Sequence, residues 1–198
     1  GKLEQHSSVA PVVSEKLCTR CGACLPGCAH GAIEIGDHAA IVDPQLCTGC
    51  GRCISLCPTR AMQIQWNEES GKVMRKMAEY ALAALDGKQG KKLFINFITQ
   101  VSPSCDCYGH SDAAIVPDIG ILASTDPVAL DQACADLVNQ AQGLPGTALS
   151  SGHEPGGDKF CGVHPQIDWE ITLKHGEKVG LGSRMYELKR LEPKGKDW

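Results

Sequence analysis

The sequence predicts a mixed α+β or α/β protein in which a small cysteine-rich module precedes part of an α/β domain. Two runs of four cysteines repeat within the first third of the 198 residues. Patterns typical of strands and helices then alternate along the rest of the chain, which favours an α/β architecture. These strands are too few for a self-sufficient sheet. We therefore expect a lead-in segment over 1–9, the module over 10–66, and the C-terminal portion of an α/β domain over 67–198.

The module is predicted from an internal repeat with a period of 29 residues. Residues 10–13 align with 39–42, and residues 17–22 align with 46–51. Each copy reads as a short strand, a cysteine loop, a short helix and a second short strand. Self-similarity at a fixed spacing indicates an internal duplication, so the two copies should form one pseudo-symmetric module.

Each copy carries four cysteines at the spacing Cys-x-x-Cys-x-x-Cys-x-x-x-Cys. Thiolate is a soft, anionic ligand, and such short steps let one tight loop hold three corners of a cubane cluster. Zinc sites usually combine two cysteine pairs set apart, so the pattern favours two 4Fe–4S clusters over two zinc sites. Clusters that only hold the fold together are a further alternative. The eight candidate ligands are Cys18, Cys21, Cys24, Cys28, Cys47, Cys50, Cys53 and Cys57.

The α/β portion is predicted from hydrophobic periodicity and from helix-cap residues. Apolar residues recur at helical spacing over 72–86, and Asp126 followed by Pro127 begins a helix that should reach about residue 142. The β-rich run 93–99 predicts a buried strand. The other expected segments are a strand over 119–123, a long Gly- and Pro-rich loop over 144–165, a helix over 168–179 and an extended tail around 185–191.

Residues 10–65 resemble a two-cluster bacterial-type ferredoxin domain. In that pattern the fourth cysteine of each run binds the cluster of the other run. The resemblance therefore implies single-electron transfer at low potential and two ligand sets. These sets are Cys18, Cys21, Cys24 and Cys57 for one cluster, and Cys47, Cys50, Cys53 and Cys28 for the other. The chain departs from the pattern where Ala29 follows Cys28, because Pro58 follows Cys57; this changes one turn and removes no ligand.

Residues 90–140 and 165–191 resemble the C-terminal half of the uncharacterised domain family 362, a group of iron–sulfur centre proteins. The segments that carry the resemblance are 104–107, 112–124, 126–131, 164–169 and 180–183. The resemblance implies that a ferredoxin module is inserted into an α/β domain, with residues 1–8 similar to the segment before the insert. The N-terminal half of that domain is then absent from this sequence. We therefore expect tight association with another chain, or with a second copy, that completes the sheet.

A second candidate site follows the strand predicted at 93–99. Cys105, Cys107 and His110 lie within six residues of one another, beyond the carboxyl end of a strand, where α/β folds usually bind ligands. They could hold an additional metal or form a redox-active thiol pair, and they are the candidate catalytic residues. A tight polar loop with small buried thiols is the alternative, since free cysteine is often simply buried.

The remaining polar candidates are weaker. Cys134 falls on the apolar face of its helix and is predicted to be a core residue. Cys161, with His153 and His164 nearby, could complete a metal site with Cys105 and Cys107, but a thiol in a structureless loop is the favoured interpretation. Asp112 and Asp118 are expected to serve turns and caps rather than to bind a metal.

The charge and the hydrophobic pattern of the sequence argue against two classes of function, nucleic-acid binding and membrane spanning. A net charge of −4 and a pI of about 6.0 indicate no nucleic-acid surface. No apolar run approaches the roughly 20 residues that span a membrane, and no signal peptide is visible, so we expect a cytoplasmic protein.

The favoured function is transfer of single electrons to a redox partner protein or to a site in the α/β part. The alternatives are a redox or metal enzyme with chemistry at Cys105 and Cys107, which would be an oxidoreductase component, and purely structural clusters.

Overall fold

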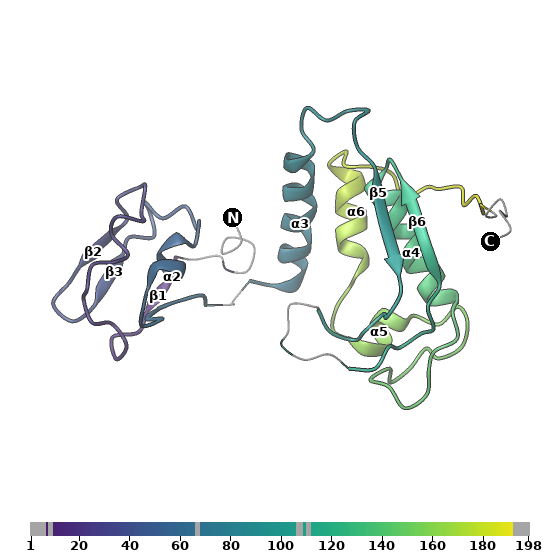
Figure 1. Cartoon of the computed structure of the whole chain (residues 1–198), viewed down its shortest axis with the longest axis horizontal. Helices are drawn as coiled ribbons and strands as arrows, with labels where there is room; N and C mark the ends of the chain where they lie inside the picture. The colour runs from purple at the N-terminus through teal and green to yellow at the C-terminus, as the bar shows by residue number, and fades with distance from the viewer. Residues whose placement is uncertain (1–6, 8–9, 66–67, 106–108, 110–111, 192–198) are drawn as a thin grey trace, which may run out of the picture. The chain divides into compact units, whose positions relative to one another are not determined.

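The computed structural model describes residues 7, 10–65, 68–105, 109 and 112–191. The chain divides into two compact units, unit 1 (Gly1–Val73) and unit 2 (Met74–Trp198). Both combine short strands with helices, so the predicted mixed α and β class is confirmed (Figure 1). No helix among the described residues is long and apolar enough to cross a membrane.

The described residues of unit 1 form four very short strands, one short helix and the first turn of a longer helix. The strand that opens the first copy of the repeat, β1 (Val12–Val13), pairs antiparallel with the strand that closes the second, β4 (Met62–Gln63). Likewise β2 (Ile33–Ile35), which closes the first copy, pairs antiparallel with β3 (Ala40–Val42), which opens the second. This reciprocal pairing gives the pseudo-symmetry that the repeat predicts.

The short helix predicted in each copy forms only in the second, as α2 (Arg52–Leu56). The corresponding residues 23–27 of the first copy are turns. Pro26 removes an amide donor and Gly27 has a low helix propensity, which explains the difference. Gly27 also has a packing role, because a Cβ at this position would collide with the side chain of Leu56.

The core of unit 1 is small and rich in sulfur. Its buried cluster consists of Cys24, Ala40, Cys53 and Met62, with partly buried apolar side chains packed around them, and further buried apolar residues are the alanines Ala32, Ala39 and Ala61. Two of these four residues are candidate ligands, so the unit has little apolar core that is independent of its cysteines. A module of this kind depends on whatever its thiols bind for much of its stability.

Unit 2 carries the remaining elements in an order close to the predicted one (Figure 1). Helix α3 (Ser70–Ala84) begins at the end of unit 1 and continues into unit 2, where strand β5 (Phe94–Ile98) pairs antiparallel with β6 (Gly120–Ser124). Helix α4 (Pro127–Gln140) lies against both strands. The last two helices are α5 (Lys159–Val163) and α6 (Glu170–Lys178).

The predicted helix start at Asp126 is confirmed. Its Oδ1 accepts hydrogen bonds from the amides of Val128 and Ala129 at 2.9 and 3.0 Å, which satisfies two of the free donors of the first turn of α4. The other carboxylate oxygen accepts from the amide of Ser183 at 2.8 Å. Gly182 leaves no room for a Cβ beside this carboxylate. One side chain therefore caps a helix and anchors a segment far along the chain.

The prediction that the run 93–99 is a buried strand is wrong for one face of the strand. The side chains of Ile95, Phe97 and Ile121 are 51%, 66% and 61% exposed. The alternate residues of β5 lie on the side that α4 covers, and Ile98 there is buried. A continuous apolar run suits a strand covered on both faces, but in the described residues only one face of β5 is covered. The expected extended tail around 185–191 forms no strand.

The expected loop over 144–165 also contains structure. Helix α5 begins after Asp158, whose Oδ1 accepts from the amide of Cys161 at 2.9 Å. The side chain of Lys159 is fully buried, and its ammonium group donates to the carbonyls of Asn139, Glu154 and Gly157 at 2.8, 2.6 and 3.2 Å. These contacts fasten the segment to the end of α4.

Candidate metal-cluster sites

The eight cysteines of unit 1 gather around two separate cavities. We name these site 1 and site 2. Site 1 is lined by Cys18, Cys21, Cys24 and Cys57, and site 2 is lined by Cys28, Cys47, Cys50 and Cys53. Each set joins three cysteines of one copy to the fourth cysteine of the other, which is the grouping that the ferredoxin resemblance implies. The reciprocal strand pairing produces this exchange, because β1 pairs with β4 and β2 pairs with β3.

Each cysteine loop turns sharply at a glycine. Gly22 and Gly51 follow the second cysteine of their loops and have φ values of 73° and 75°, in the left-handed region that glycine adopts without strain. The third thiol of each loop is buried, at 8% exposure for both Cys24 and Cys53, whereas Cys21 and Cys50 are exposed. Each site therefore has a dry inner side and an outer side that faces solvent.

Backbone amides are directed at several of the sulfurs. The fourth cysteine of each run accepts a hydrogen bond from the amide four residues later, from Ala32 to Cys28 at 3.3 Å and from Ala61 to Cys57 at 3.2 Å. At Cys57 the hydroxyl of Thr59 lies 3.6 Å from the same sulfur. Hydrogen bonds of this kind stabilise negative charge on sulfur, whether the sulfur is a free thiolate or bound to a metal.

Burial and hydrogen bonding act in opposite directions on the thiols. Burial raises the pKa of Cys53 to about 11 and also raises the pKa of Cys24. Burial opposes the thiolate of Cys57 as well, but hydrogen bonds from nearby backbone amides and from Thr59 outweigh it and lower the pKa of Cys57. A buried thiol with a raised pKa ionises readily only when a cation binds to it, so metal binding at either site would release protons.

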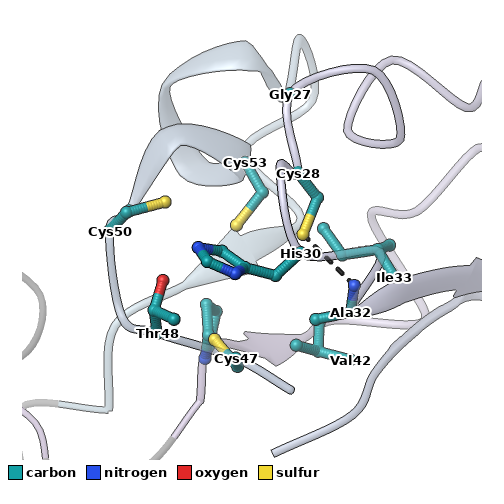
Figure 2. A pocket seen from close by; sticks show the side chains of 12 residues that line it. Gly27, Cys28, His30, Ala32, Ile33, Val42, Cys47, Thr48, Cys50 and Cys53 are labelled. Carbon is teal, nitrogen blue, oxygen red and sulfur yellow. Dashed lines mark hydrogen bonds between the residues drawn. The ribbon is translucent and has the colours of Figure 1, made fainter.

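Figure 2 shows the sulfurs of site 2 directed toward a common space, with the imidazole of His30 among them. Pro11 and Thr48 also line this site. Arg20 and Thr59 line site 1. Sequence reasoning from the cysteine spacing missed these lining residues. The signal that could have found most of them is their place in the sequence, because His30, Thr48, Arg20 and Thr59 lie within two residues of a cysteine; Pro11 does not.

The lining of both cavities fits a 4Fe–4S cluster. Each offers four thiols, and among the described residues no aspartate or glutamate lines either cavity. Soft sulfur ligands without competing carboxylates suit iron–sulfur clusters and disfavour magnesium or calcium. The short apolar side chains around the thiols, such as Ala32 and Ala61, leave room for a compact inorganic group close to the backbone.

The structure describes only part of the second candidate site. Cys105 is exposed, and Cys107 and His110 lie outside the described residues. The ring of His164 lies 2.7 Å from the carbonyl oxygen of Pro103, so this histidine contacts the segment that leads into Cys105. Cys161 sits in helix α5, and the prediction that it is a structureless loop thiol is wrong.

The weaker candidates occupy structural positions. Cys134 is half-buried against the larger core of unit 2, as predicted, and its Sγ accepts from the side-chain amide of Asn96 at 3.4 Å. Burial raises the pKa of Cys134, so it behaves as a neutral core thiol. Asp118 accepts from the amide of Gln100 at 2.8 Å, and Asp112 accepts from the amide of the next residue at 2.7 Å. Both aspartates support turns.

Comparison with known proteins gives one match. A search of curated proteins found no match, and a search of solved structures found none either. The family model described as "Domain of unknown function (DUF362)" matches residues 4–136, which include the whole cysteine module and most of α4. Because this match covers more than half of the sequence, the chain belongs to the DUF362 family.

Proposed function

We propose that this chain is an iron–sulfur protein that carries two 4Fe–4S clusters and transfers single electrons to a redox partner protein or to a site in unit 2. The observation that carries the proposal is the convergence of two sets of four thiols on two cavities of one small unit. A bound cluster of this type supplies one-electron redox chemistry at a potential set by charge, hydrogen bonds and exposure.

The residues of the chain would divide the work of holding such clusters. The buried thiols Cys24 and Cys53 exclude water from the inner side of each site. The exposed cysteines Cys21 and Cys50 mark the outer sides, where a redox partner could approach. Amides and the Thr59 hydroxyl stabilise the negative charge of the ligating sulfurs. We therefore expect electrons to enter and leave on the Cys21 and Cys50 sides.

A redox titration followed by electron paramagnetic resonance tests this function. The chain, purified or reconstituted without oxygen, should contain about eight iron and eight sulfide and should show two reversible one-electron reductions. Clusters that no low-potential reductant can reduce would reject electron transfer and leave the structural alternative. Zinc in place of iron would reject the clusters altogether.

A second candidate function is redox or metal chemistry at the Cys105 loop. The contact between His164 and Pro103 favours it, because it brings an imidazole to the segment that precedes Cys105. The test replaces Cys105 and Cys107 with serine and measures iron and other metals per chain. This function predicts the loss of a metal beyond the eight iron atoms, or the loss of a disulfide that forms under mild oxidation. An unchanged metal content together with unchanged thiol chemistry would reject it.

We also propose that unit 2 binds an additional strand beside β5, supplied by another chain or by a second copy. The proposal is supported by the exposed apolar face around Phe97 and by a groove along β5. The groove is lined in part by Val138, Leu173 and Trp169. A bare strand edge over an apolar groove is a site for strand addition. Light scattering on the purified chain should show association that Phe97→Asp weakens; a monodisperse monomer with one cooperative thermal transition would contradict this.

A further inference from the structure

The two cluster sites differ at positions that the repeat makes equivalent. Resting on the function proposed above, we propose that site 1 has the higher reduction potential, so that the first electron added to the module resides at site 1. Reduction makes a cluster more negative by one charge, and donors or cations around it favour that change. Three pairs of equivalent residues each favour site 1.

The first pair is Ala40 and Pro11. The amide of Ala40 donates to the sulfur of Cys18 in site 1 at 3.4 Å. Pro11 occupies the equivalent position in the other copy and lines site 2. Proline has no amide hydrogen, so the corresponding hydrogen bond to Cys47 cannot form. This donor is therefore present at site 1 and absent at site 2.

The second pair is Thr59 and His30. The hydroxyl of Thr59 lies 3.6 Å from the sulfur of Cys57, which already accepts from a backbone amide. The equivalent His30 lines site 2, and the ring makes no hydrogen bond to Cys28 in the described residues (Figure 2). Site 1 thus gains a second donor at the fourth cysteine that site 2 does not have.

The third pair is Arg20 and Gly49. Both have left-handed backbones, with φ values of 56° and 66°. Glycine adopts this conformation freely, but an L residue with a side chain is strained in it. The first copy nevertheless carries Arg20 at this position. Arg20 lines site 1, and its Nη1 donates to the carbonyl of Asp37 at 2.9 Å. This hydrogen bond holds a positive charge beside site 1.

One arginine lies in the loop of the other site. Arg52 is the first residue of α2 and is exposed, and it does not line the cavity of site 2. The equivalent residue of the first copy is Ala23. Both arginines are exposed and are screened by water and salt, but only Arg20 lines a cavity, so the effect of Arg52 on site 2 should be smaller than that of Arg20 on site 1. Arg52 also provides a matched control.

The test is a potentiometric titration of the full chain with both clusters, followed by electron paramagnetic resonance. Dithionite is the electron donor; it is oxidised, each cluster gains one electron, and no proton is transferred. Thr59→Val and Arg20→Gly should each shift the higher potential downward and move the lower one less. The shift in Arg20→Gly should shrink at high salt, because screening weakens the interaction of the exposed charge, and the shift in Thr59→Val should not.

The reciprocal variant acts on the other site. Pro11→Ala restores an amide hydrogen opposite Cys47 and should raise the lower potential, which narrows the gap between the two. The control Arg52→Ala should leave the higher potential unchanged. Arg20→Gly relieves backbone strain and copies the residue of the other repeat, so it should fold and bind its iron; Thr59→Val changes no backbone group.

The outcomes separate this inference from the function on which it rests. A chain that holds zinc, or clusters that cannot be reduced, refutes the proposed function. If both clusters can be reduced but Thr59→Val and Arg20→Gly shift the lower potential, the higher potential belongs to site 2. That result overturns only the inference and leaves the proposed function intact. Two reducible clusters that respond to neither variant also overturn it. A downward shift confined mainly to the higher potential supports it.

Discussion

Removing the ammonium group of Lys159 should destabilise unit 2 by about 3 kcal/mol. The side chain is fully buried and donates to three backbone carbonyls at 2.6–3.2 Å. Lys159→Met keeps most of the apolar stem but removes three hydrogen bonds, each of which contributes roughly 1 kcal/mol. The carbonyls of Asn139 and Glu154 still accept from the amides of Gly156 and Gly157, so among the described residues only the carbonyl of Gly157 loses its donor.

Urea unfolding followed by circular dichroism and by the fluorescence of Trp169 measures this change. The ring of Trp169 stacks beside Phe160, with centroids 4.9 Å apart, so it reports on the same segment. A loss of about 3 kcal/mol corresponds to a fall in the melting temperature on the order of 10 °C for a unit of this size. The control is Lys178→Met, which removes an exposed lysine and should change stability by less than about 0.5 kcal/mol. Equal effects from the two variants would refute the role assigned to Lys159.

Three further predictions concern the cap of helix α4, the removal of bound metal and the dependence of stability on pH. Asp126→Ala removes the cap of α4 and the contact to Ser183, and should lower the urea midpoint by an amount equivalent to about 1–2 kcal/mol; Asp126→Asn, which keeps one acceptor, should lose less. Removing iron with a chelator under acid should unfold unit 1 and leave unit 2 folded, as limited proteolysis would show; equal resistance of unit 1 before and after removal would contradict the account of its core. Burial opposes ionisation of Asp158, but hydrogen bonds from Cys161 and from Trp169 outweigh it and lower the pKa of this carboxyl below its usual value. The ionised carboxylate therefore stabilises the fold above about pH 4. This contribution is lost as the pH falls through the lowered pKa. An acid titration of Trp169 fluorescence should therefore show a transition that Asp158→Asn removes; the same transition in both proteins would assign it to another group.

The grouping of the cysteines could be predicted from local spacing together with the resemblance to two-cluster ferredoxins. Three cysteines at short steps share one loop in any fold, and the resemblance implies that the fourth is exchanged between the copies. The residues that distinguish the sites could not be predicted from spacing alone. Pro11 and Thr59 line opposite sites only because the strands pair reciprocally, and their chemical difference matters only beside a sulfur.

In unit 2 the helices and strands with strong patterns were predictable, and the exceptions have physical causes. Helix α5 is only five residues long, too short for periodicity, and it lies in a segment whose Gly and Pro content predicts a loop. Tertiary contacts form it, with Asp158 as the cap and Lys159 as the buried anchor. The one-sided exposure of β5 was not predictable, because an apolar run such as 94–98 reads the same whether one face or both faces are covered.

The most direct test of the central claim is a count of iron, acid-labile sulfide and zinc per chain in protein purified without oxygen. Two sets of four thiols that each hold a 4Fe–4S cluster predict about eight iron, about eight sulfide and no zinc. The variant Cys24→Ser replaces a thiol that lines site 1 and not site 2. It should lower the number of iron atoms retained at site 1 and leave about four iron atoms at site 2. About two zinc per chain with no sulfide would contradict the claim that these cysteines hold iron–sulfur clusters.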